Sequence, residues 1–496
     1  MNEQMMKRAT IFEMVMAASL CVAMNIFTYF TNFLQYYMTG IVGIGTVLAG
    51  SFVTIFRLWD AVTDIGVGIS VDRTNSRFGK FRPWILAGMV LNVVFSGLLL
   101  FLPYHLPENV PLRMAVYIVC YMVCVVGATC LNPATRSTAQ VLTDDPKQRA
   151  MIGMIRGVML QIFYAIMPII VFSHIIPVTK GFNIEFFKRF WMVFAGATVI
   201  FCITGIIGLS GKDPKENAQN TILKPEEKIN FREMWDVIKH NRPLQMLILS
   251  AGSDKLATVC QNNATIVVIL YAIVAGNAEL NSGANKYTMI PCILMLILGL
   301  GGIGRKFGAK KTMLFGSLGG IVVCTLSILL WIFGDPKTFS FPGIEGFNGW
   351  TGFTICFLIL WCLYKGFTMV TSNVTNPMIA DVIDYEQYRS GRYMPGLVGA
   401  LFSFADKVIS SIGPTLVSLL IAGIGFHNDL PTLDTPFSNK LFAVGLFGMY
   451  GMVIIGLIIN LIAMKFYDLD PEKMEMIRKE LAKRKGEEKM AETERK

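Results

Sequence analysis

Long apolar segments alternate with short polar segments along almost the whole chain. Each apolar segment holds about 20 residues or more, and a helix that rises about 1.5 Å per residue then crosses a hydrocarbon layer roughly 30 Å thick. The pattern predicts an all-α membrane protein with twelve transmembrane helices. The expected spans are residues 11–38, 42–71, 83–103, 112–133, 151–176, 189–210, 243–273, 286–304, 311–334, 350–380, 396–424 and 441–467.

One long polar segment, residues 211–242, interrupts this alternation and is predicted to be a cytoplasmic linker. It separates an N-terminal six-helix bundle, residues 1–210, from a C-terminal six-helix bundle, residues 243–467. Residues 468–496 are rich in Glu, Lys and Arg and contain no spanning stretch. We expect them to form a polar cytoplasmic tail whose helix frays at the end.

Short motifs recur at matching places in the two halves. R-F-G-K at 77–80 follows the second span, and R-K-F-G at 305–308 follows the eighth. Asn-Pro pairs stand at 132–133 near the end of the fourth span and at 376–377 in the tenth. Two parallel six-helix repeats facing a central cavity are the arrangement of major-facilitator transporters. The sequence therefore predicts that fold.

Composition agrees with a protein that crosses the membrane many times: 53% of residues are hydrophobic, 16% are charged and the mean hydropathy is +0.54. The net charge of +10 does not indicate nucleic-acid binding, because the basic residues lie in alternate short loops. That distribution follows the positive-inside rule and predicts that both termini are cytoplasmic. The ten cysteines all lie in apolar segments without metal-ligand spacing, so we expect neither disulfides nor a zinc site.

Charged residues inside the second span are the main candidates for chemistry. Arg57, Asp60 and Asp64 would together cost roughly 7–10 kcal/mol if unpaired at the membrane centre. Their spacing places all three on one face of a helix. Paired carboxylates suit a small cation such as Na⁺, or a proton if their proximity raises one pKa. The alternative is an ion pair with Arg57 that only locks helix packing.

Other intramembrane polar residues are candidates for the same cavity. Buried Lys and Arg residues indicate function by default, whereas Ser, Thr and Asn often only hydrogen-bond neighbouring helices. The predicted substrate-binding candidates from these helices are Asn132, Arg136, Arg156, Lys255, Ser372 and Asn376. Lys407 in the eleventh span is a further functional candidate.

The basic loop after the second span is a candidate gate that pairs with loops of the other half when the cavity faces outward. Its alternative role is orientation by positive charge alone. The gating candidates, with Arg57 grouped among them, are Arg57, Asp72, Arg73, Arg77, Lys80 and Arg82. No phosphate-binding loop, metal-ligand cluster or nucleophile–base motif stands out, so the sequence does not predict an enzyme.

Several motifs resemble one transporter family. R-L-W-D-A-V-T-D at 57–64 continues into D-R-T-N-S-R-F-G-K-F-R-P-W at 72–84, and A-D-V-I-D-Y-E-Q-Y, D-K-V and Y-D-L-D-P-E-K follow at 380–388, 406–408 and 467–473. Together these resemble the glycoside–pentoside–hexuronide:cation symporters over nearly the whole chain.

The resemblance implies a role for several residues. It makes Asp60 and Asp64 the cation-site carboxylates, with Thr63 and Thr129 contributing to the site and Lys407 lying near both cation and sugar. It also makes Asn132 and Arg156 sugar contacts.

Two positions depart from the family's best-known member. Met24 and Asn25, of which Asn25 is a further substrate-binding candidate, stand where that member has an acidic sugar-binding residue, and Arg136 stands where it has an aromatic residue. Both changes make the cavity more basic, so Arg136, Arg156 and Lys255 favour an anionic sugar such as a uronide over a galactoside.

The predicted function is secondary active symport of Na⁺ or H⁺ with a glycoside or sugar acid, by alternating access. The protein is expected to be a multi-pass protein of the inner or plasma membrane, to act as a monomer and to need no cofactor beyond the coupling ion. Its predicted partners are the lipid bilayer and a small-molecule sugar. Two alternatives remain: a cation-coupled transporter of a lysolipid-like amphiphile, and a non-transporting membrane sensor of the same fold.

Overall fold

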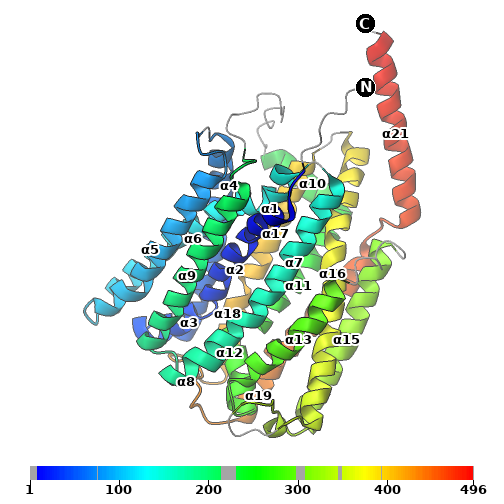
Figure 1. Ribbon diagram of the computed structural model, residues 1–496. Helices are drawn as coiled ribbons and strands as arrows, with labels where there is room; N and C mark the ends of the chain where they lie inside the picture. Colours follow the sequence, from blue (N-terminus) through cyan, green and yellow to red (C-terminus); the bar gives the residue numbers. More distant parts are fainter. Residues whose placement is uncertain are drawn as a thin grey trace.

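The structure is a computed structural model that describes residues 8–74, 76–143, 145–213, 231–297, 308–344, 349–391 and 394–494. The regular elements in these ranges are helices, most of them long and aligned roughly with one another (Figure 1). Side-chain caps fix where many helices begin. Asn109, Asp145, Asn183 and Asn241, for example, each accept a hydrogen bond from a backbone N–H in the first turn of the helix that follows.

The first group of helices, here called the N-terminal helix group, runs from residue 11 to residue 209. Its elements are α1 (Ile11–Ala18), α2 (Leu20–Thr31), α3 (Leu34–Tyr37), η1 (Met38–Val42), α4 (Thr46–Asp72), α5 (Arg82–His105), α6 (Val110–Leu142), α7 (Pro146–Pro168), η2 (Ile169–Ile175), α8 (Ile176–Thr179) and α9 (Ile184–Leu209).

The second group, here called the C-terminal helix group, follows the linker. Its elements are α10 (Phe231–His240), α11 (Arg242–Gln261), α12 (Ala264–Val267), η3 (Val268–Val274), α13 (Leu280–Ile297), α15 (Ala309–Phe333), η4 (Pro336–Thr338), α16 (Gly352–Ser390), α17 (Pro395–Ser411), α18 (Gly413–Gly423), α19 (Asn439–Leu446), η5 (Phe447–Gly451) and α20 (Met452–Phe466). The helix α21 (Pro471–Glu494) closes the chain.

Within the described residues, ten helices are long and apolar enough to cross a membrane, and a bent pair makes eleven. The bent pair joins α11 to the segment Ala264–Val274 at 54°. The bend falls at Asn262 and Asn263, and the Asn263 side chain caps the second piece by accepting from the Thr265 N–H. The predicted span 286–304 overlaps α13 but extends past Ile297, so its second part lies outside the described residues. Twelve spans stay a prediction.

Helix faces match a lipid surround. On α5, Leu86, Val90, Val94, Leu98 and Leu102 recur every four residues and are all exposed. Such a stripe would be unfavourable in water, but it is the expected surface of a helix that faces hydrocarbon chains. Its opposite face packs on α6, where a Cβ added at Gly88 would lie 2.6 Å from the Gly127 carbonyl oxygen. The small residue lets the two helices approach closely.

The two helix groups meet along a few helices. α4 packs on α17 and α18, and α7 packs on α13. Along α4, the partner residues run backwards through the other group: Thr46 meets the Asp429 carbonyl, Thr54 meets the Ser411 carbonyl, and Asp64 meets Lys407. Between Asp64 and the end of α4, the described residues show no hydrogen bond or ion pair from this helix to the C-terminal helix group.

The start of α1 and the helix α21 lie at one end of the molecule, together with the ends of α4 and α16 (Figure 1). The contacts between the groups are therefore concentrated at the opposite end, which we call the sealed end. There Gln35 donates to the Ser418 hydroxyl at 2.5 Å and accepts from Asn263 at 3.4 Å, while the Tyr36 hydroxyl donates to the Pro431 carbonyl at 2.8 Å.

Candidate functional site

Two carboxylates of α4 and one lysine of α17 meet where the two helix groups touch. Lys407 Nζ donates to Asp60 Oδ2 at 2.8 Å and also to Asp64 Oδ2. The i,i+4 spacing puts both carboxylates on the same face of α4, as the sequence predicts. The pair therefore shares one ammonium group, which comes from the other helix group.

The remaining carboxylate oxygens are held by α6. The Thr129 hydroxyl donates to Asp60 Oδ1 at 3.0 Å, and Asn132 Nδ2 donates to Asp64 Oδ1 at 2.8 Å. Thr63 lies 3.0 Å from Thr129, hydroxyl to hydroxyl, and donates to the Asp60 carbonyl at 3.1 Å. Asn132 was predicted as a substrate contact, and here it orients a carboxylate. We call Asp60, Asp64, Thr129, Asn132 and Lys407 the carboxylate site.

The carboxylate site is partly shielded from solvent. The side chains of Asp60, Asp64 and Lys407 are 31%, 20% and 18% exposed. Two carboxylates and one ammonium leave a net charge of −1. Arg136 reaches Asp64 at 4.0 Å, but its side chain is 61% exposed, so water screens that pair. Among the described residues, no group of three or more His, Cys, Asp or Glu is placed to hold a metal ion.

Arg57 does not pair with these carboxylates in the described part of the structure. Its Nη1 donates to the Ser410 carbonyl of α17 at 3.4 Å. The alternative interpretation, an ion pair of Arg57 with a carboxylate of its own helix, thus has no contact to support it, and Lys407 takes that place. Arg57 instead ties α4 to the C-terminal helix group.

The predicted substrate residues fall into separate places. On α2, the Asn25 side chain accepts from the Tyr164 hydroxyl at 2.7 Å and donates to the Cys21 carbonyl at 2.8 Å. Arg156 is half-buried on α7, where its carbonyl accepts from the Cys21 thiol at 3.8 Å. These contacts place Asn25 and Arg156 together at the packing of α2 on α7, within the N-terminal helix group.

In the C-terminal helix group, Lys255 of α11 forms an ion pair with Asp406 of α17. Asp406 directly precedes Lys407, so consecutive residues of α17 serve two different charge pairs. Asp406 is an acid inside an apolar span, which is the sequence signal that marks it as a candidate for such a pairing. Ser372 of α16 is exposed, and the side chain of Asn376 lies outside what the structure describes.

The predicted gate is bound to its own helix group in this conformation. Asp213, just after α9, accepts hydrogen bonds from the backbone N–H groups of Lys80, Phe81 and Arg82. Arg82 Nε also lies 3.5 Å from Asp213. Gly79 has φ +100°, and a Cβ there would lie 2.2 Å from the Asp213 carboxylate, so the loop requires a glycine.

Among the described residues, Arg73 and Arg77 show no hydrogen bond or ion pair with the C-terminal helix group, whereas Arg57, grouped with the gate candidates, contacts Ser410 of that group. Arg73 and Arg77 are exposed, and the side chain of Asp72 lies outside the described set. Gating by this loop stays a prediction.

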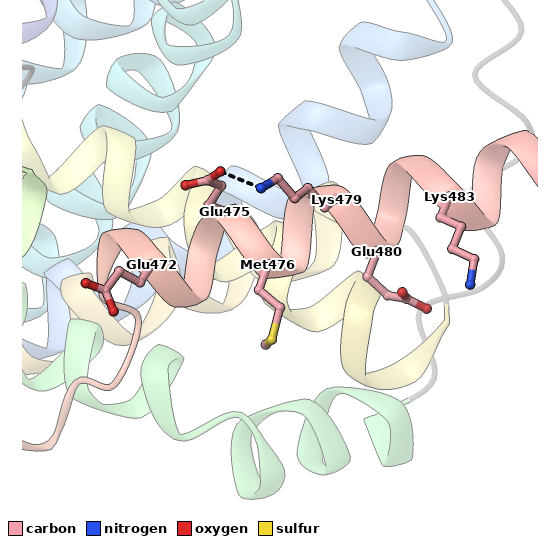
Figure 2. Close-up of a pocket in the computed structure, with 6 residues that line it drawn as sticks. All are labelled: Glu472, Glu475, Met476, Lys479, Glu480 and Lys483. Atoms are coloured by element: carbon pink, nitrogen blue, oxygen red, sulfur yellow. Dashed lines mark ion pairs between the residues drawn. The ribbon is translucent and has the colours of Figure 1, made fainter.

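A hollow on the surface of α21 is unrelated to the carboxylate site. Figure 2 shows its lining, which consists of Glu472, Glu475, Met476, Lys479, Glu480 and Lys483. All six belong to a single helix, and Lys479 Nζ pairs with Glu475 at 2.7 Å. The hydrogen bond and charge of Lys479 lower the pKa of the Glu475 carboxyl. This is a solvated helix face with no opposing wall, which does not suit a transport site.

The chain is similar in sequence to known sugar transport proteins. A family model described as "MFS/sugar transport protein" matches residues 16–471. The chain is 23% identical over 402 residues to the glucuronide carrier protein homolog of Escherichia coli (strain K12), covering 79% of each chain. It is 23% identical over 457 residues to the isoprimeverose transporter of Lactiplantibacillus pentosus, covering 91% of this chain and 87% of the relative.

It is also 24% identical over 406 residues to the putative glycoside/cation symporter YagG of Escherichia coli (strain K12), covering 79% of this chain and 78% of the relative. Among solved structures, the nucleoside transporter NupG superposes with a TM-score of 0.55 at 12% identity, covering 93% of this chain and 100% of that one. This last likeness concerns the fold alone.

Proposed function

The chain belongs to the MFS/sugar transport protein family, and from that premise we propose that it couples entry of Na⁺ or H⁺ to uptake of a glycoside or sugar acid. Membership makes it a multi-pass cell-membrane transporter of a small sugar-type molecule, and not an enzyme. The cation, the direction of coupling and the substrate are what the proposal adds. The name of one relative, a putative glycoside/cation symporter, supports the coupling.

The observation that carries the proposal is the sharing of Asp60 and Asp64 by Lys407. A coupling cation that binds the two carboxylates has to replace the ammonium group, because both compete for the same oxygens. Since Lys407 belongs to the other helix group, this replacement changes a contact between the groups. Cation binding would thereby shift the balance between conformations, as symport requires.

Alternating access follows from the arrangement of the two groups. We take them as two six-helix bundles joined by the linker, with both termini in the cytoplasm, and the sealed end then faces outside. The carboxylate site lies at the last contact between α4 and the opposite group, so it would sit at the floor of a cytoplasmic opening. The described state is then one that releases cation and substrate inward, with Lys407 in the cation's place.

The structure does not narrow the substrate class to anionic sugars. Two of the three basic residues predicted to attract an anionic sugar, Arg136 and Lys255, each lie within 4.0 Å of a carboxylate. They are thus partly neutralised within the protein. The relatives' names cover both a glucuronide and isoprimeverose. The proposal therefore keeps both glycosides and sugar acids.

Uptake into membrane vesicles tests the coupling, with Na⁺ and pH gradients imposed separately across a panel of glycosides and uronates. We expect one gradient to drive accumulation, and Asp60→Asn and Asp64→Asn each to abolish it while exchange of substrate persists. The matched control is Asp335→Asn, because Asp335 lies outside the carboxylate site, at the cap of the short helix Pro336–Thr338. This variant should accumulate substrate normally. Accumulation that survives both carboxamide variants would refute the coupling, and a sensor would show no uptake at all.

A further inference from the structure

The helix α16 carries a polar stripe through the membrane. Lys365, Thr368 and Ser372 recur at intervals of three and four, which places them on one helix face. The exposed apolar residues Ile355, Ile359 and Leu363 lie on another face, as expected for a surface in contact with lipid. The polar stripe therefore faces away from that lipid-facing surface, and its exposed member Ser372 was already a predicted substrate contact.

Lys365 lies at the middle of the predicted span 350–380. It is thirteen residues into α16, or about 20 Å from the start of the helix. Its Nζ lies 5.0 Å from the ring centre of Trp361 and 5.9 Å from that of Tyr364. Among the described residues, no carboxylate lies within ion-pair distance of it. Lys407, Lys255 and Arg136 each have such a partner.

A second group beside it also lacks a partner. The Nε1 of Trp361 is buried and has no hydrogen-bond acceptor among the described residues, and the whole side chain is 7% exposed. Tyr364 differs, because its hydroxyl donates to Gln261 at 2.9 Å. An ammonium group and an indole N–H, four residues apart on one helix face, therefore both offer donors without an acceptor.

The ammonium group of Lys365 and the indole N–H of Trp361 determine which kind of ligand could bind both. A cation–π contact offsets only part of the cost of an ammonium group inside the membrane, and a buried N–H is normally hydrogen-bonded. Both groups can only donate, so a ligand that completes them must present acceptor oxygens, and the charge of Lys365 favours an anionic one. Apolar and cationic ligands do not meet this requirement.

We propose that Lys365 and the indole N–H of Trp361 bind the oxyanion of an acidic sugar, making Lys365 the residue that selects a sugar acid over the neutral glycoside. This inference rests on the proposed sugar transport. It assigns the substrate's negative charge to α16, while Arg136 and Lys255 remain with their carboxylates. A neutral sugar would leave the ammonium group and the indole N–H without their charged acceptor.

Matched sugars in the vesicle assay test the assignment. The probes are methyl glycosides of several hexoses and the uronate of each one. Lys365→Met should raise the KM for the uronates by about ten- to a hundred-fold, the range expected when a charged hydrogen bond is lost, and leave that for neutral glycosides within about two-fold. Trp361→Phe keeps the ring and loses the N–H, so we expect a several-fold effect of the same selectivity. Lys365→Arg should retain most uronate transport.

The control is Lys286→Met, because Lys286 also lies over an aromatic ring, that of Tyr287 at 5.7 Å, but is exposed on α13. It should leave both kinds of sugar unaffected. If Lys365→Met does not reach the membrane, Trp361→Phe and Lys365→Arg still report the selectivity.

The possible results distinguish a failure of the anion assignment from a failure of the proposed sugar transport. If the wild-type protein carries neutral glycosides only, or if Lys365→Met and Trp361→Phe affect both kinds of sugar equally or not at all, the anion assignment is overturned and sugar transport stands. If the wild-type protein carries no sugar of either kind, the proposed function fails first. Selective loss of uronates supports the assignment.

Discussion

The carboxylate site sets a competition between two cations for the same oxygens. Two carboxylates held on neighbouring turns repel each other, and that repulsion strengthens their attraction for any cation nearby. Lys407 satisfies this attraction in the described state. A mobile ion can enter only as the ammonium group withdraws, so Lys407 should weaken cation binding and at the same time make release possible.

Removing that competitor gives the first prediction. Lys407→Met keeps the length of the side chain and removes the ammonium group that Asp60 and Asp64 share. We expect the affinity for the coupling cation to rise about ten- to a hundred-fold, because a charged hydrogen bond no longer opposes it, while gradient-driven uptake is lost. Tryptophan fluorescence of the purified protein, titrated with Na⁺ and separately with H⁺, measures the affinity.

Lys440→Met serves as control for this experiment, since Lys440 is exposed at the start of α19. Its cation affinity should equal that of the wild-type protein. Unchanged or weaker cation binding in Lys407→Met would show that the lysine supports the cation and does not compete with it.

For single residues, the sequence predicted the placement of the two carboxylates but not the cation that pairs with them. The i,i+4 spacing sufficed to place Asp60 and Asp64 on one face, because helical geometry is local. It could not choose the partner of the carboxylates. Arg57 was the nearest cation along the chain, yet the cation in contact comes from residue 407, and its place depends on how two distant helices pack. Its position inside an apolar span made Lys407 a functional candidate, but only the resemblance to a known family placed it near the cation.

For whole helices, too, the sequence predicts what depends on local hydropathy and misses what depends on tertiary contacts. Most predicted spans coincide with long apolar helices in the described residues, because hydropathy is a local signal. The seventh was predicted as one span, and its bend at Asn262 and Asn263 was not foreseen. The tail was predicted to be a polar, frayed helix, but α21 buries Met474, Ile477 and Leu481 against the end of the C-terminal helix group. Three apolar residues among many charges give a weak pattern. Only the tertiary contact reveals that this helix is anchored.

The approach of α4 to α18 at the sealed end depends on one glycine. A Cβ at Gly50 would lie 2.0 Å from the Ser418 hydroxyl oxygen and 2.9 Å from the Pro414 carbonyl oxygen. The second atom belongs to the backbone and cannot rotate away. Substitution at this position should therefore separate the two helices.

We predict that Gly50→Ala destabilises the sealed state by about 1–3 kcal/mol, the usual cost of overpacking, and shifts the protein toward the conformation open at that end. Hydrogen exchange of backbone amides in residues 418–431 should become faster. Gly66→Ala on the same helix, where a Cβ meets nothing within 4 Å, should leave exchange unchanged. Equal exchange in both variants would mean that Gly50 does not set the seal.

For the whole molecule, direction of transport depends on which end faces the cytoplasm. The end of the molecule that carries α21 also holds the end of α4 and the start of α7 (Figure 1), and the loop that follows α4 contains Arg73, Arg77 and Lys80. Positive residues concentrate there, and the positive-inside rule predicts that this end faces the cytoplasm. With that orientation, we expect the carboxylate site to face inward and Lys407 to occupy it in the state from which cation and sugar leave.

Reporter fusions test this orientation. Green fluorescent protein joined after residue 496 should fluoresce, and alkaline phosphatase at the same place should be inactive, because each folds on only one side of a bacterial inner membrane. Phosphatase joined after Gly181, in the turn between α8 and α9 at the sealed end, should be active and provides the matched control. The reverse result at both sites would invert the topology. The described state would then be open to the outside. Lys407 would occupy the cation's place before cation and sugar bind, and not after they are released.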